Sequence, residues 1–127
     1  MQLFDRFLTT ITDHLPLPKP SSEQVRLLAK LNPDKFYVEN VRAILGVSTR
    51  SATQICEIAV NQDLFERRVE VLCPDGSVAA SATTEDKLPS AVECEQEVNG
   101  FHDSQLLETR TLRKVTYYRL ADPARHS

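Results

Sequence analysis

The first fourteen residues place apolar side chains at the spacing of a single helix face. Such a face repeats every three or four residues, so the pattern predicts an amphipathic helix over residues 1–14. Residues 15–20, Leu-Pro-Leu-Pro-Lys-Pro, then form a stiff linker, because proline removes a backbone donor and restricts the preceding residue. The helix either folds back onto the following domain or pairs with another chain, a protein partner or a second copy. Its candidate protein-interaction residues are Leu3, Phe4, Phe7, Leu8 and Ile11.

Residues 21–61 carry the pattern of three short helices. Ser21 and Gln24 have the spacing of a capping box, in which each side chain satisfies the backbone N–H of the other residue. Gly46 suits the left-handed turn that closes the second helix, and Ser48 is placed to cap the third. We therefore expect compact helical structure across this segment.

The pattern changes to strict alternation near residue 67. Residues 67–73 alternate as a strand does, and Pro74-Asp75-Gly76 has the chemistry of a tight turn, so residues 77–82 are expected to return as a second strand. Residues 92–98 form a further strand that exposes carboxylates on one side. Asn99-Gly100 ends that strand as a strong turn pair.

The remaining sequence adds one β-prone run, residues 111–120, and a tail that is expected to fray. Either Tyr118 and Leu120 or Val115 and Tyr117 point inward from this run. The predicted fold class is α+β, with a separate amphipathic helix at the N-terminus and an antiparallel β extension at the C-terminus. The predicted segments are 1–20 (helix and linker), 21–82 (main domain), 83–120 (β extension) and 121–127 (tail).

Length and composition favour an ordinary globular chain. It has 127 residues, of which 41% are hydrophobic and 26% charged, which is enough apolar sequence for one core. No apolar run is long enough to cross a bilayer, so we expect no membrane partner. Three cysteines without a signal peptide favour a cytoplasmic location and free thiols, and a disulfide framework is not expected.

The net charge of −3 conceals a strong asymmetry. Residues 74–108 contain eight acidic residues and one basic residue, Lys87, for a net charge of −7. Residues 109–127 contain five basic residues and one acidic residue, for a net charge of +4. These stretches either pair with each other or lie as solvated faces, or one of them is a partner surface.

The order of helices followed by a hairpin resembles the winged-helix domain, a helix-turn-helix variant with a hairpin wing. The resemblance covers residues 21–82. Residues 41–48, Val-Arg-Ala-Ile-Leu-Gly-Val-Ser, resemble the second helix and turn of many bacterial helix-turn-helix proteins, and residues 67–82 stand where the wing belongs. The resemblance implies either DNA binding or a derived role in protein interaction.

Two later segments resemble the knuckles of a zinc ribbon, in which paired Cys-x-x-Cys motifs hold a metal. They are Cys73-Pro74-Asp75-Gly76 and residues 88–97, but Gly76 and Glu97 replace both second cysteines. A structural zinc site needs four ligands, so no metal is expected and only a ribbon-like hairpin shape remains. The resemblance then implies that Cys73 and Cys94 pack as small apolar residues or lie close together.

The sequence contains no motif for catalysis or for a cofactor, and no enzyme activity is expected. Two of the three histidines, His14 and His126, lie on terminal segments, and His102 follows a turn and is expected at the surface. Cys56 lies on the apolar face of the third helix and is expected to be a core thiol. Glu93 and Glu97 are interpreted as parts of a solvated face rather than as an acid and base pair.

Two functions therefore remain. The favoured hypothesis is a non-catalytic adaptor, or a small subunit of a larger assembly, because a detachable helix and an acidic hairpin provide two docking surfaces. The alternative is a DNA-binding regulator that reads a site with the helix starting near Thr49. Its candidate DNA-binding residues are Arg42, Thr49, Arg50, Ser51, Thr53, Gln54, Arg67 and Arg68.

Overall fold

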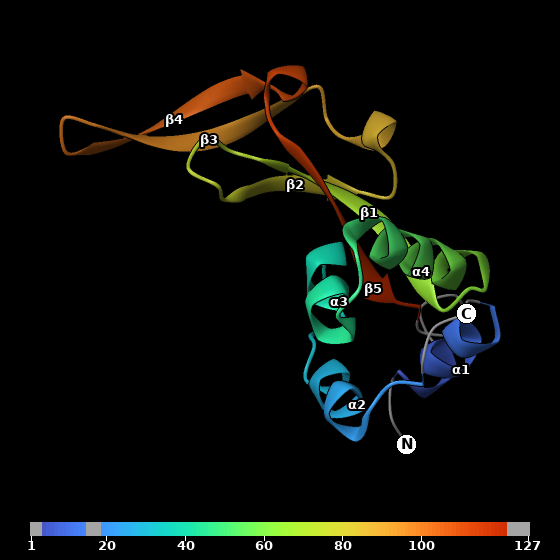
Figure 1. Ribbon diagram of the computed structural model, residues 1–127. Coiled ribbons are helices and arrows are strands. Elements are labelled where there is room, and N and C mark those ends of the chain that lie inside the picture. The colour runs from blue at the N-terminus through green and yellow to red at the C-terminus, as the bar shows by residue number, and fades with distance from the viewer. Residues whose placement is uncertain (1–3, 15–18, 122–127) are drawn as a thin grey trace. The chain divides into compact units, whose positions relative to one another are not determined.

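The computed structural model describes residues 4–14 and 19–121 (Figure 1). It confirms the α+β class, with four helices and two small antiparallel sheets in the described residues. The helices are α1 (Asp5–His14), α2 (Ser22–Ala29), α3 (Val38–Leu45) and α4 (Thr49–Asn61). The strands are β1 (Phe65–Leu72), β2 (Val78–Ala82), β3 (Ala91–Val98), β4 (Phe101–Glu108) and β5 (Lys114–Leu120), and the 3-10 turns are η1 (Glu85–Lys87) and η2 (Thr109–Thr111). None of the described helices is long and apolar enough to cross a membrane.

The chain forms two compact units. Unit 1 comprises Met1–Arg67 and Tyr118–Ser127, and unit 2 comprises Arg68–Tyr117. The limits of these units differ from the predicted boundaries at residues 20, 82 and 120. Of the tail predicted to fray, residues 121–127, all but Ala121 lie outside the described residues.

The helix ends in unit 1 follow the local chemistry of the sequence. The Gln24 backbone N–H donates to Ser21 Oγ at 3.2 Å, and the Ser21 backbone N–H donates to Gln24 Oε1 at 2.8 Å, which confirms the capping box. Gly46 ends α3 with φ of 66°, a left-handed conformation that favours glycine. Ser48 Oγ accepts a hydrogen bond from Ser51 N and so caps α4.

An aromatic cluster forms the core of unit 1. Phe65, at the start of β1, lies with its ring centroid 4.7 Å from that of Phe7 and 4.8 Å from that of Phe36. Tyr118 of β5 joins this cluster, and the backbone N–H of Phe36 donates to its carbonyl at 2.9 Å. The buried face of α4, including Ile55 and Cys56, completes the core. Burial and the Glu57 charge raise the pKa of the Cys56 thiol to about 12, which confirms a core thiol.

The strands form one three-stranded and one two-stranded sheet. Their orders are β2-β1-β5 and β3-β4, and every pairing given by register is antiparallel. Asn99 and Gly100 have φ of 54° and 81°, as the predicted turn requires. The strand β4 was not predicted, because its residues have neither clean alternation nor many β-branched side chains. Tyr117 and Tyr118 are both buried, so neither predicted alternative for β5 is complete.

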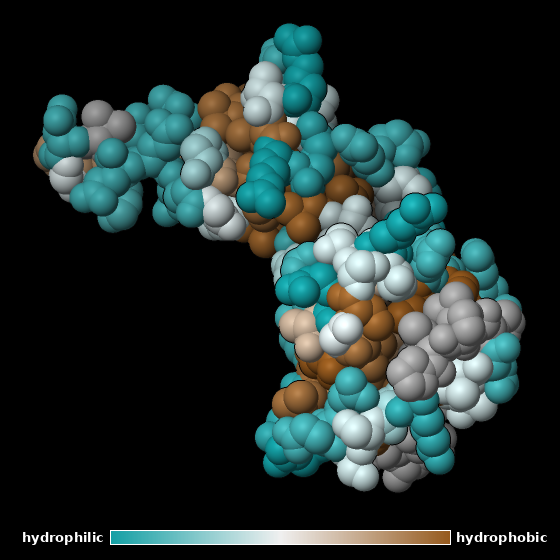
Figure 2. All heavy atoms as spheres, viewed as in Figure 1, coloured by the Kyte–Doolittle hydropathy of each residue, from teal (hydrophilic) through white to brown (hydrophobic). Residues whose placement is uncertain are grey.

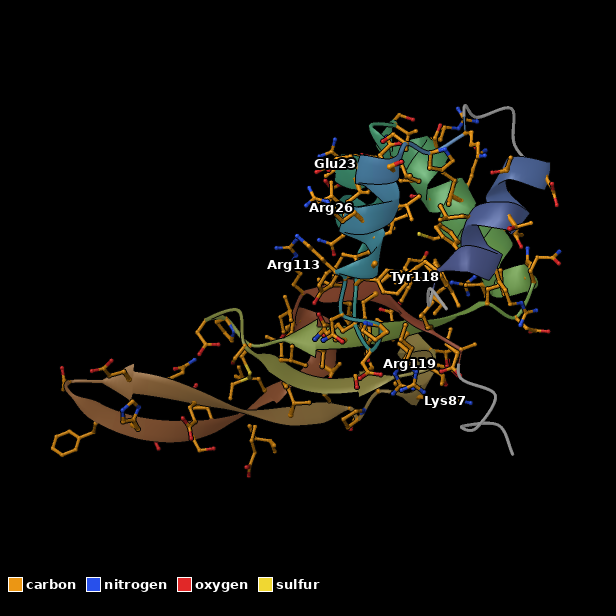
Figure 3. The ribbon with its side chains drawn as sticks, turned by 90° about the horizontal axis from the view of Figure 1, so that it is seen from below. Glu23, Arg26, Lys87, Arg113, Tyr118 and Arg119 are labelled. Carbon is orange, nitrogen blue, oxygen red and sulfur yellow. A yellow bond between two sulfur atoms is a disulfide. The ribbon has the colours of Figure 1, made fainter. Side chains whose placement is uncertain are left out.

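A small apolar cluster and a disulfide hold unit 2 together. The buried residues are Val71, Cys73, Leu88, Val92 and Cys94. The expectation of free thiols is wrong for two cysteines, because Cys73 and Cys94 form a disulfide with 5.7 Å between their Cα atoms. Figure 3 shows its sulfur–sulfur bond as a yellow stick beside the β3–β4 hairpin. The bond joins the end of β1 to the middle of β3, and it agrees with the expectation that these cysteines lie close together.

We expect Phe7→Ala to lower the free energy of unfolding by about 3–5 kcal/mol, because it leaves a cavity against Phe65. Phe101→Ala is the matched control, since the Phe101 side chain is 76% exposed and its loss should cost no more than about 0.5 kcal/mol. Denaturant titration of both variants measures the difference. Equal small effects would show that α1 does not contribute to the core.

We expect reduction with dithiothreitol to destabilise unit 2 by about 3 kcal/mol, since the disulfide closes a loop with a sequence separation of 21. Thermal unfolding with and without the reductant measures this change. A chain with Cys73→Ser and Cys94→Ser should unfold at the lower temperature under both conditions. A wild-type melting temperature unaffected by the reductant would contradict the bond.

Candidate interaction surfaces

The amino end of α4 is an exposed polar surface. Thr49, Arg50, Thr53 and Gln54 are all exposed, and Ser51 is half-buried. The helix starts at Thr49 because Ser48 caps it, so the first two turns present these side chains together. The structure therefore places this part of the predicted DNA-binding set on one surface.

The other arginines of the predicted DNA-binding set already have partners. Arg42 Nε lies 2.8 Å from Glu39 Oε2, one helix turn away. Arg67 forms two hydrogen bonds with Glu57, and Arg68 Nε donates to Tyr117 Oη at 3.0 Å. Phosphate binding depends on positive charge, and two of these guanidinium charges are balanced by carboxylates. Within the described residues, Arg50 is the arginine of this set with no ion pair or side-chain hydrogen bond.

Glu57, Arg67 and Tyr118 form a network in unit 1. Tyr118 Oη donates to Glu57 Oε2 at 2.6 Å, and Arg67 Nε donates to the same oxygen at 3.0 Å. Burial alone would raise the pKa of Glu57, but the hydrogen bonds from Arg67 and Tyr118 and the Arg67 charge outweigh it, so the pKa lies below its usual value. Burial and the bond to Glu57 raise the pKa of the Tyr118 phenol. The network therefore holds an ionised carboxylate and a neutral phenol at neutral pH.

The predicted protein-interaction face of α1 needs correction. Phe4 and Phe7 are 2% and 1% exposed, and Leu8 packs against the same core. Leu3 and the Ile11 side chain lie outside the described residues. Of the two alternatives for this helix, the structure has the one in which it folds back, because the rings of Phe4 and Phe7 meet the aromatic cluster. These two residues are therefore not available for docking.

The β3–β4 arm, residues 91–108, is the most acidic surface of unit 2. It carries five acidic side chains and no lysine or arginine. Glu93, Glu95 and Glu97 are exposed in a row along β3, as the alternation predicted, and no described residue forms an ion pair with them. Figure 2 shows that the far end of the arm is mainly hydrophilic. His102 is exposed there, as expected.

The basic residues after the arm are largely balanced by neighbouring acids. Arg110 Nε lies 2.7 Å from Glu108, Lys114 Nζ lies 3.9 Å from Glu85, and Arg119 Nε lies 2.5 Å from Glu66. The first two pairs join the acidic and basic stretches, as one alternative for the charge asymmetry predicted. The glutamate row on β3 is left out of this pairing.

Two exposed apolar side chains lie on the same arm. Phe101, directly after the turn, is 76% exposed, and Leu106 is 71% exposed. Leu106 also lines an open hollow of about 750 Å³ in unit 2, together with Leu88, Pro89, Ala91 and Leu107. Two ion pairs, Glu85 with Lys114 and Glu108 with Arg110, also line this hollow. Sequence reasoning missed this surface because it did not predict β4.

The described residues contain no group of three or more side chains suited to hold a metal ion. Cys73 and Cys94, the two cysteines that the ribbon-like segments retain, are bonded to each other, so neither sulfur is a thiolate. Comparison of the chain with protein families, with curated proteins and with solved structures finds no match.

We expect Tyr118→Phe to raise the pKa of Glu57 toward its usual value and to lower the free energy of unfolding by about 1 kcal/mol, because one hydrogen bond to the carboxylate is lost. Tyr117→Phe is the control, since Tyr117 does not bond Glu57. A carbon-13 NMR titration of the Glu57 carboxyl measures the pKa of both variants.

The lowered pKa of Glu57 also fixes the direction of a pH effect. The ionised Glu57 carboxylate contributes fully to the free energy of unfolding above about pH 4.5, which is the ordinary pKa of a glutamate. This contribution is lost as the pH falls through the lower pKa of Glu57 in the folded state. The acid-side loss should be smaller in Tyr118→Phe. The same loss in both chains would contradict this account.

Proposed function

We propose that this chain is a non-catalytic interaction module of winged-helix type, which acts as an adaptor or as a small subunit of a larger protein assembly. The observation that carries the proposal is the β3–β4 arm, whose row of Glu93, Glu95 and Glu97 is exposed and outside the ion pairs of the described residues. An exposed row of one charge next to exposed apolar side chains is typical of an electrostatically selective protein contact.

The order of the elements supports the winged-helix part of the proposal. Helices α2, α3 and α4 precede the β1–β2 hairpin, the turn after α3 uses Gly46, and α4 begins at the cap Ser48. The non-catalytic part is supported by the burial and raised pKa of Cys56, the free thiol of the described residues. A protonated, buried thiol is a poor nucleophile.

The exposed start of α4 keeps DNA binding as the alternative function. Arg50 and Gln54 are exposed in the first two turns of α4, which supports a role for this helix in reading bases. The ion pairs of Arg42 and Arg67 weaken this alternative, because a DNA-binding domain needs several cations free for phosphates. We therefore place protein interaction first.

Site-specific photocrosslinking tests the proposal in the cells that make the protein. A photoreactive benzoylphenylalanine replaces Phe101 on the arm, Gln54 on α4, or Gln62, an exposed control position after α4. We expect a discrete protein adduct from position 101 and none from position 62. Glu95→Gln combined with Glu97→Gln should reduce the yield of that adduct, because the contact depends on charge.

Fluorescence anisotropy with a labelled random-sequence duplex tests the alternative. At low salt we expect no binding at protein concentrations up to about 10 µM, where nonspecific DNA binders begin to saturate. Binding that weakens with salt and is lost in Arg50→Ala, together with a DNA adduct from position 54, would overturn the proposal in favour of a regulator.

A further inference from the structure

We propose that the outer edge of β4 binds an extended basic segment of a partner protein as an added β-strand, with one apolar side chain of that segment seated against Leu106. This inference rests on the proposed function and names the partner chemistry for the β3–β4 arm. Three features of the arm support it: the hydrogen-bond pattern of the hairpin, the side chains beside the edge, and the charge.

The turn fixes which backbone groups of β4 point outward. Val98 faces Phe101 across the two-residue turn, and in such a hairpin this pair exchanges both backbone hydrogen bonds, as does every second pair that follows. The Thr109 N–H donates to Ser90 O at 3.0 Å, which continues the ladder in the same phase. The N–H and C=O groups of the residues between the bonded pairs therefore point away from β3. Along the exposed part of β4 these residues are His102, Ser104 and Leu106.

This edge is open in unit 2. The sheet has two strands, so β4 has β3 as its neighbour and no described strand on its other side. His102, Ser104 and Leu106 are exposed, and no described residue forms a backbone hydrogen bond with them beyond the ladder. An unpaired edge of this kind is a template for an incoming strand.

The side chains beside the edge favour a basic residue at the centre of the added strand. Ser104 lies directly opposite Glu95 on the ladder, so both side chains project from the same face of the arm. Neighbouring strands are about 4.8 Å apart, which places the added strand about 10 Å from β3. A lysine or arginine opposite Ser104 can extend over this small side chain and meet the Glu95 carboxylate.

Leu106 supplies an apolar anchor two residues further along the same edge. It is 71% exposed, and it lines the open hollow that Pro89, Ala91 and Leu107 also line. A leucine-sized side chain beside Leu106 would cover this exposed surface. Alternating pockets for side chains give specificity to strand addition, while the backbone bonds give affinity.

The charge of the arm decides between a foreign segment and a second copy. The arm carries five acidic side chains and no lysine or arginine, so two arms brought edge to edge would repel each other. A basic segment gains the attraction of the glutamate row instead. The edge of β3 is less suited to strand addition, because Glu93, Glu95 and Glu97 stand directly along it.

Peptide binding to the full chain tests the inference. The probe is a fluorescent, capped, threonine-based peptide in which every second residue is lysine, with leucine at the last of these positions, prepared in both sequence directions. We expect saturable binding by anisotropy, and none for the same peptide with glutamate in place of lysine. Ser104→Pro should weaken binding about tenfold or more, since it removes an outward N–H without removing a β3–β4 hydrogen bond. Ser104→Val keeps the N–H and should retain binding.

Paired charge variants separate a local contact from general attraction. Glu95→Gln and Asp103→Asn each remove one charge, but Asp103 pairs with Gln96 and so lies on the opposite face of the arm. We expect the first change to weaken binding several-fold and the second to have little effect. Circular dichroism and amide NMR spectra verify that each variant keeps the fold.

Three results would overturn the inference. Binding that is equal in Ser104→Pro and Ser104→Val would show that no strand is added at this edge. Equal weakening by Glu95→Gln and Asp103→Asn would show nonspecific attraction. A dimer detected by light scattering and lost in Ser104→Pro would assign the edge to a second copy. A protein adduct from position 101 alongside any of these results leaves the interaction module standing, whereas loss of that adduct removes the proposed function itself.

Discussion

The Cys73–Cys94 disulfide is the constraint on which unit 2 depends. The apolar cluster of this unit contains five buried residues, and two of them are the bonded cysteines. A core of this size supplies little stability, and small domains commonly need a covalent staple. Because Cys94 lies in the middle of β3, the bond fixes that strand to the end of β1. The hydrogen-bonded register then positions β4, and the glutamate row and the open edge follow from that register.

Unit 1 depends instead on aromatic packing and internal charge pairs. Phe65 of β1 and Tyr118 of β5 are far apart in the sequence but lie in one buried cluster. Glu57 accepts hydrogen bonds from both the Tyr118 phenol and Arg67. Four arginines of this unit pair with neighbouring carboxylates and Arg50 does not, while the carboxylates of β3 are exposed in unit 2. The charge that the β3–β4 arm offers to a partner is therefore negative. The exposed negative charge of the arm, rather than the net charge of the chain, favours a basic partner.

The features that could be predicted from the sequence depend on neighbouring residues. Ser21, Gly46 and the Asn99-Gly100 turn act within a few positions of themselves, so their chemistry was sufficient to place them. The exposed glutamates of β3 followed from simple alternation. What could not be predicted depends on residues far apart in the chain. The burial of Phe7 requires Phe65, and the disulfide requires a fold that brings residues 73 and 94 together.

Two features of the strands could not be predicted for a different reason, because alternation assigns a single buried face to a strand. Glu70 is 2% exposed although it alternates with the buried Val71, so β1 has buried side chains on both of its faces. The strand β4 has no buried face over residues 101–106, so it gave no apolar period to detect. A strand exposed on both sides gains little from its own side chains. Its order derives from the ladder with β3, and through β3 from the disulfide.

The two edges of the arm differ in how they are protected against pairing with another chain. Exposed strand edges invite pairing with other chains, and proteins commonly protect them with charged residues or proline. The edge of β3 has such protection in Glu93, Glu95 and Glu97, whereas the outward residues of β4 are a histidine, a serine and a leucine. The acidic row also repels a second acidic arm, so it limits self-association while it leaves the β4 edge open to a strand of opposite charge. The same carboxylates thus act both as protection against the wrong partner and as attraction for the right one.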